Sequence, residues 1–237
     1  MEKPTDVIYA ELQHAYDMFN QHLYDGTLPD CLITLQREKK SYGYFSAERF
    51  GNRDGEKTDE IALNPTYFAV VPLIEIMQTL AHEMSHVWQH HHGKPGRGRY
   101  HNREWADKLE SLGLMPSSTG HPGGKRTGDS MADYPIKGGK FLDVCQQLLT
   151  EEFKISWYDR FGSLKDGHTS FGLSMDLPEG GETIAANDGV EMAEATTKPG
   201  NKSNRAKYTC SCDINLWGKP GLNVLCGDCN EKFEEAA

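Results

Sequence analysis

The stretch HEMSH, from His82 to His86, lies in a segment between Pro72 and His92 whose apolar residues recur at helical spacing. An α-helix advances about 100° per residue, so side chains four positions apart lie on the same face. His82 and His86 can therefore offer two imidazole nitrogens to a single divalent cation. Glu83 faces the same opening without having to be a ligand. Two metal ligands beside a general base form the core of a zinc hydrolase site.

The segment that carries this motif is predicted to be an amphipathic helix starting near Pro72, where a missing amide is harmless. Its apolar side chains gather on one side of a helical projection, roughly opposite to the two histidines: Leu73, Met77, Leu80, Met84, Val87 and Trp88. A lone histidine on a helix is usually a surface or core residue. Two histidines in an HExxH motif that lie opposite the apolar side of the helix instead favour a metal site at the floor of a cleft.

The remaining pattern predicts helices and a small sheet, which together indicate an α+β fold. Helices are expected over residues 4–23, 102–112 and 141–153, and short strands over 31–35, 42–45 and 60–63. Residues 116–140 are rich in Gly, Ser, Pro and Lys and are expected to form an extended surface loop, followed by a strand at 154–158.

The composition limits the class of protein. A chain of 237 residues can hold one enzyme-sized core and an appendage, and a net charge of −10 argues against basic surface throughout. The N-terminus has no apolar run like that of a secretory signal, and no apolar stretch is long enough to span a bilayer. We therefore expect no membrane partner and a reducing, cytoplasmic location. The composition does not indicate an oligomeric state.

Catalytic zinc requires a third protein ligand, for which the residues leave alternatives. His90 lies two helical turns, about 12 Å, from His82, which is too far for one tetrahedral ion. His92 has the right spacing for a motif that turns the chain sharply with glycine, but Gln89 occupies that position. Glu104 could supply a carboxylate from the following helix, and His101 lies at the start of that helix.

The C-terminal region contains two close cysteine pairs, Cys210 with Cys212 and Cys226 with Cys229. Four thiolates in two pairs form a tetrahedral cage suited to structural zinc. The intervening INLWGKPGLNVL predicts two short strands around a Lys-Pro-Gly turn, and therefore a zinc ribbon that needs its metal to fold. Cys31 and Cys145 are isolated and are expected to be ordinary buried thiols.

The composition shifts predict three parts of the chain. Residues 1–161 would form the domain with the HEMSH helix, 162–205 a polar flexible linker, and 206–237 the ribbon.

These motifs resemble the SprT-like metalloprotease family. The resemblance rests on HEMSH, on His101 followed by Glu104 and Trp105, and on the upstream YGYF and EIALNP segments, and it covers about residues 5–160. One departure is Asn102, where the family frequently has glycine. Such proteins often carry a zinc ribbon after the protease domain.

The resemblance implies a zincin-like domain with helices packed on a small sheet. It makes His101 the third ligand, so that His82, His86 and His101 would hold a catalytic Zn²⁺ with Glu83 as general base. Cys210, Cys212, Cys226 and Cys229 would hold a structural Zn²⁺. The implied substrates are proteins bound or crosslinked to DNA. Three residues are candidates to stabilise the oxyanion: Arg99, Tyr100 and His121.

Local charge gives DNA binding some support. From Lys94 to Arg126 the chain has seven Lys or Arg against three acidic residues, next to the predicted cleft. A solvated loop without a ligand explains such a run equally well. A competing hypothesis is a non-catalytic DNA- or protein-binding module in which both metals are structural.

Overall fold

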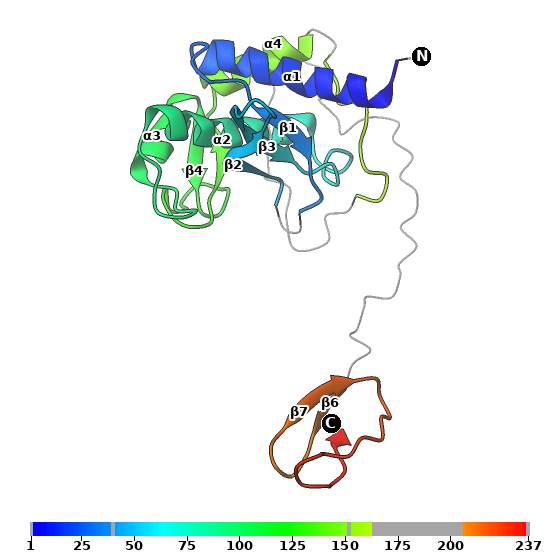
Figure 1. Ribbon diagram of the computed structural model, residues 1–237. Coiled ribbons are helices and arrows are strands. Elements are labelled where there is room, and N and C mark those ends of the chain that lie inside the picture. Colours follow the sequence, from blue (N-terminus) through cyan, green and yellow to red (C-terminus); the bar gives the residue numbers. More distant parts are fainter. Residues whose placement is uncertain (1, 39–40, 151–152, 163–205, 236–237) are drawn as a thin grey trace. The chain divides into compact units, whose positions relative to one another are not determined.

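The computed structural model describes residues 2–38, 41–150, 153–162 and 206–235 (Figure 1). The chain divides into two compact units, and the described residues up to 162 belong to the first and those from 206 to the second. The predicted linker lies, apart from Gly162, outside the described residues. The expected boundaries therefore stay predictions, whereas the α+β class is confirmed: the chain folds into helices with small sheets.

The first unit contains four helices and five strands among its described residues. In chain order they are α1 (Pro4–Leu23), β1 (Leu32–Leu35), β2 (Gly43–Gly51), β3 (Lys57–Leu63), α2 (Leu73–His92), α3 (Arg103–Ser111), β4 (Leu114–Ser117), β5 (Ala132–Pro135) and α4 (Lys140–Thr150).

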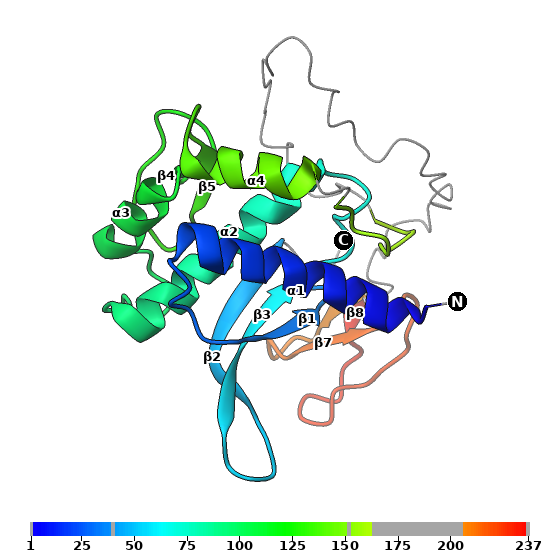
Figure 2. The ribbon, with the colours of Figure 1, turned by 90° about the horizontal axis from the view of Figure 1, so that it is seen from above.

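Helices α1 and α4 lie side by side in the first unit (Figures 1 and 2). Helix α1 buries the apolar stripe that its sequence predicts, from Ile8 to Leu23. Phe19 of α1 meets Phe141 of α4 edge to face, with ring centroids 5.9 Å apart, and both side chains are fully buried. The segment around residue 141 is thus part of the same hydrophobic core as the N-terminal helix.

The main sheet has the strand order β1-β3-β2. Strand β1 pairs with β3 in parallel and β2 pairs with it in antiparallel orientation, so β2 has a free outer edge within this sheet. Strand β2 continues six residues beyond the expected end at Phe45, and only residues 52–56 form the loop of the hairpin. The sequence after Phe45 obscured this extension because residues 47–51 are exposed on both faces of the strand and show no alternation of polar and apolar residues.

Helix α3 begins at the expected place. The Asn102 side chain accepts a hydrogen bond from the backbone N–H of Trp105 at 3.1 Å and caps the helix. Gly113 follows the helix with φ +95°, which a side chain would disfavour.

The prediction of an extended loop over residues 116–140 was wrong where the chain forms β4 and β5. Strand β4 pairs in antiparallel orientation with β5, from Leu114 opposite Pro135 to Ser117 opposite Ala132. The two strands are four residues long and lie far apart in the sequence, so no local turn pattern indicated that they pair.

The predicted strand at 154–158 was also wrong. This segment is assigned to no strand, although Ile155 is buried. The backbone N–H and the hydroxyl of Ser156 both donate to the carboxylate of Glu11 on α1. A side chain therefore satisfies this backbone in place of a neighbouring strand.

The second unit is a small sheet with the order β7-β6-β8, built from β6 (Ala206–Thr209), β7 (Asn215–Gly218) and β8 (Glu234–Glu235). Of the two strands expected around the Lys-Pro-Gly turn, the structure forms the first, β7, which pairs with the preceding β6, and the second was wrong. Residues 222–225, directly after the turn, form no strand, and Leu225 makes an isolated bridge with Lys232. No helix in the described part of the chain is long and apolar enough to cross a bilayer.

Candidate functional site

Three imidazoles converge at the middle of α2. His82 and His86 come from this helix, and His101 comes from the segment just before α3, where it forms an isolated bridge with Gly128. One nitrogen of each ring lies within 4.8 Å of the other two, and the Nε2 atoms of His86 and His101 are 3.1 Å apart. The structure thus brings together the three histidines that the sequence and the resemblance singled out.

Two of the rings are held by acceptors behind them. Nδ1 of His82 lies 2.7 Å from Oδ2 of Asp133, a buried residue of β5. Nδ1 of His101 lies 3.1 Å from the carbonyl oxygen of Gly128. Since both partners accept hydrogen bonds, each Nδ1 carries the proton and each Nε2 keeps its lone pair for the centre.

Trp105 of α3 forms the base of this cluster. Its ring centroid lies 4.9 Å from that of His82, 5.3 Å from that of His86 and 4.4 Å from that of His101, and the side chain is fully buried. The indole restricts the ring orientations that the histidines can adopt. The aromatic residue that the resemblance noted after the third histidine therefore has a direct packing role.

The three histidines fit a zinc ion. Zinc–nitrogen bonds of 2.0–2.1 Å in tetrahedral geometry separate two ligand nitrogens by about 3.3 Å, close to the 3.1 Å between His86 and His101. Burial lowers the pKa of His86 well below its usual value and that of His101 to about 4. Both rings are therefore neutral near pH 7, as metal ligands must be.

Glu83 is buried beside this cluster and lines the same cleft. Burial raises the pKa of its carboxyl group to about 7, and a hydrogen bond from the backbone N–H of Phe45 on β2 acts in the opposite direction. The side chain is thus held between the metal-ligand cluster and the first part of strand β2.

The other candidate ligands point elsewhere. Oε2 of Glu104 accepts hydrogen bonds from the Gln89 side chain at 3.0 Å and from the backbone N–H of Lys94 at 2.6 Å. Nε2 of His92 lies 3.0 Å from the carbonyl oxygen of Thr27. His90 belongs to a different group, with Asp59 and His91.

An open cleft of about 810 Å³ leads to the histidines. Residues 41–47, which include the start of β2, form one wall and α2 contributes the floor. The loop around 95–101 and residues 129–133, which lead into β5, line much of the remainder. Of the three candidate oxyanion donors, Arg99 and Tyr100 line the cleft and His121 does not.

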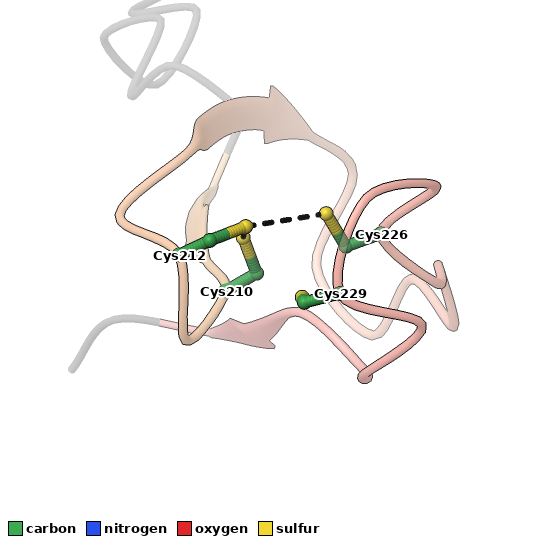
Figure 3. Close-up of side chains that lie close together, drawn as sticks. All are labelled: Cys210, Cys212, Cys226 and Cys229. Atoms are coloured by element: carbon green, nitrogen blue, oxygen red, sulfur yellow. Dashed lines mark hydrogen bonds between the residues drawn. The ribbon is translucent and has the colours of Figure 1, made fainter.

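The four C-terminal cysteines also converge. Their sulfur atoms lie within 4.8 Å of one another, with 3.0 Å between Cys210 and Cys212 and 3.5 Å between Cys212 and Cys226 (Figure 3). A zinc ion with bonds of 2.3 Å to four sulfurs needs them about 3.8 Å apart. The cluster therefore fits a tetrahedral structural metal site.

The two isolated cysteines belong to neither centre. Cys31 and Cys145 are both buried in the core of the first unit. Burial raises the pKa of the Cys31 thiol to about 12 and raises that of Cys145 as well. Both are therefore unreactive near neutral pH.

Comparison with known proteins identifies the first unit. The sequence model of the family described as SprT-like matches residues 12–121, which include the three histidines and Trp105. The chain belongs to the SprT-like family. This SprT-like chain is also similar to an uncharacterized protein in the mucB 3' region of Salmonella typhimurium. The two are 58% identical over 59 residues, which cover 24% of this chain and 80% of that protein. No solved structure matches the chain.

Asp133 is a site residue that the sequence did not reveal, and it lies beyond the family match. It falls in the stretch expected to be a loop, and its neighbours carry no motif. Its Oδ1 atom is buried without a hydrogen-bond partner among the described residues, while Oδ2 contacts His82. Only the pairing of β4 with β5 places this carboxylate behind the histidine.

Replacing Asp133 with asparagine is expected to weaken Zn²⁺ binding at the histidine cluster about 10- to 100-fold. The amide can still accept a hydrogen bond from His82, but it lacks the negative charge that makes the ring a stronger donor to metal. Competition with a chelator of calibrated affinity measures the change, and the cysteine cluster should keep its metal. Asp143→Asn, at an exposed position on α4, is the control. Equal affinities for both variants would contradict the prediction.

Proposed function

We propose that this SprT-like protein is a zinc-dependent endopeptidase that acts on proteins bound or crosslinked to DNA. The observation that carries the proposal is the buried carboxylate of Glu83 beside three converging imidazoles in an open cleft. A general base next to a three-nitrogen metal site suits the hydrolysis of peptide bonds. Membership of the SprT-like family supports the same reaction.

Each group of side chains in the site has a different role in the proposed reaction. His82, His86 and His101 would hold zinc, which when bound acts as a Lewis acid on the scissile carbonyl and on water. The Glu83 carboxylate takes the proton from the attacking water and passes it to the nitrogen of the leaving amine. Arg99 and Tyr100, which line the cleft, are candidates to donate to the developing oxyanion.

The free edge of β2 supports a peptide substrate in extended form. In the sheet order β1-β3-β2, the outer edge of this strand has no partner among the described residues, and its first residues form a wall of the cleft. An exposed strand edge can pair with a peptide through backbone hydrogen bonds. Unfolded or flexible segments of a protein would therefore be cleaved in preference to compact domains.

The DNA part of the proposal rests on the basic stretch beside the cleft. Three of its seven cations are engaged within the unit: Arg103 and Arg126 pair with acidic side chains of α3, and the Lys108 ammonium lies over two aromatic rings. The remaining four form no ion pair within the described residues: Lys94, Arg97, Arg99 and Lys125. These are the side chains available to contact phosphates.

The test uses the full chain loaded with zinc and a denatured protein substrate, with and without DNA. We expect cleavage, including self-cleavage, that DNA increases and a chelator abolishes. Arg97→Ala should weaken DNA binding and reduce the slope of log affinity against log salt by about one. Arg126→Ala removes the same charge from an ion-paired position and should leave the slope unchanged.

The endopeptidase activity and the DNA-associated substrates are contradicted by different results. Cleavage that is the same with and without DNA would discard the DNA-associated substrates but retain the endopeptidase. An absence of cleavage under every condition, with both metal sites loaded, would discard the endopeptidase itself.

A further inference from the structure

A second cluster of possible metal ligands lies at the C-terminal end of α2. It consists of His90 and His91 from the last turn of the helix and Asp59 from β3. One ligand atom from each residue lies within 4.8 Å of the other two. Nε2 of His91 is 2.7 Å from Oδ2 of Asp59, and the rings of His90 and His91 are perpendicular with centroids 4.8 Å apart.

The carboxylate of this cluster is held in place before any ion arrives. Asp59 is only 4% exposed, and its Oδ1 accepts a hydrogen bond from the backbone N–H of Glu48 at 2.7 Å. Glu48 lies where the register of β2 against β3 shifts, and its φ of +48° is in the left-handed region. A non-glycine residue rarely adopts that conformation, and here it places the Glu48 N–H where it donates to the Asp59 carboxylate.

The cluster is separate from the one around Glu83. His90 lies one helical turn, about 6 Å of axial rise, beyond His86, and neither His91 nor Asp59 lines the cleft. One ion cannot satisfy both groups, because the imidazoles on successive turns have different partners. His90 does line the cleft, with its ring centroid 5.9 Å from that of Phe45.

The ligand types indicate which ions would bind. Two imidazole nitrogens and one carboxylate oxygen suit divalent first-row transition metals, whereas Mg²⁺ and Ca²⁺ prefer sets made only of oxygen. Both histidine side chains are exposed, so water can complete the coordination and an ion can enter from solvent. The same exposure makes us expect weaker binding than at the buried sites.

We propose that Asp59, His90 and His91 form a third metal site of the chain, for a divalent ion of the zinc, cobalt and nickel class. An ion bound there links the last turn of α2 to strand β3 and thereby to the bend in β2 at Glu48. It also draws the His90 ring from Phe45, at the wall of the cleft, towards Asp59. The site does not depend on the proposed peptidase activity, since it lies outside the hydrolytic group.

The experiment counts Co²⁺ ions bound to the metal-free full chain, by native mass spectrometry and by absorption titration. The wild type should bind three ions, the third most weakly, whereas His90→Ala and His91→Ala should each bind two under the same conditions. His92→Ala is the matched control, because this neighbouring histidine contacts the Thr27 carbonyl instead of the cluster. It should still bind three.

Two variants are needed because His91 contacts buried Asp59 and its loss could disturb the hairpin. His90 is exposed and has no such contact with Asp59 among the described hydrogen bonds, so its replacement tests the ligand role with the fold intact. Circular dichroism verifies folding. A wild type that binds only two ions, or a folded His90→Ala variant whose third ion binds less than tenfold more weakly, would overturn the proposal.

Discussion

Replacing Glu83 with glutamine is expected to lower the rate of peptide-bond hydrolysis by about 10²- to 10⁴-fold, the usual contribution of a general acid–base group. Glutamine has nearly the same shape and can still accept the hydrogen bond from the backbone of Phe45. It cannot take a proton from water. The chain should therefore stay folded and keep its metal, so that activity alone changes.

The measurement compares steady-state cleavage with metal content determined by mass spectrometry on the same sample. Glu75→Gln is the matched control, because Glu75 is a buried acid of the same helix that lies outside the cleft. It should retain the wild-type rate. If the Glu83→Gln and wild-type chains cleave equally fast, the hydrolytic mechanism is wrong and the competing hypothesis of a binding module with structural metals gains support.

Replacing Cys226 with serine is expected to unfold the second unit completely. The buried core of this unit among the described residues is small: Tyr208, Cys210, Cys226 and Phe233. A core of this size cannot offset the conformational entropy of about thirty residues, whereas structural zinc contributes about 10–16 kcal/mol in comparable small domains. Loss of one buried thiolate removes most of that contribution.

Amide NMR spectra of the full chain measure this effect. The signals of residues 206–235 should collapse to random-coil positions while those of the first unit stay dispersed, because the two units are separate compact bodies. Chelation of the wild-type metal should produce the same collapse. Cys31→Ala, which removes a cysteine outside the cluster, should leave the ribbon signals in place. Dispersed ribbon signals in the metal-free Cys226→Ser chain would contradict a metal-dependent fold.

The helices and the first two histidines could be predicted because their evidence is local. The apolar spacing of α1 and α2 predicted both helices to within about a residue, and four residues of helix suffice to place His82 and His86 on one face. The cysteine pairs are likewise close in sequence, so their spacing alone predicted a metal cage. The choice of His101 needed the family resemblance, because several donors lie within reach of the cleft along the chain.

The structure corrected the predictions for segments that pair or pack with residues distant in the sequence. The β4–β5 pair and the segment around Ile155 depend on contacts with residues far away in the chain, and neither has a turn or a period of its own. The count of basic residues overestimated the positive charge that is free to contact DNA. Arg126, for example, pairs with acidic side chains of α3. In each case a short polar segment took its conformation from what it packs against.

For this protein, the sequence alone determined where two of the imidazoles and the carboxylate of Glu83 would lie, because helical geometry repeats every few residues. Only the tertiary structure decided what stands behind the three imidazoles: Asp133 behind His82, the Gly128 carbonyl behind His101, and the Trp105 ring against all three. These groups come from a strand, a loop and a second helix that meet through long-range packing. Contacts of that kind depend on the whole core and leave no pattern in a stretch of neighbouring residues.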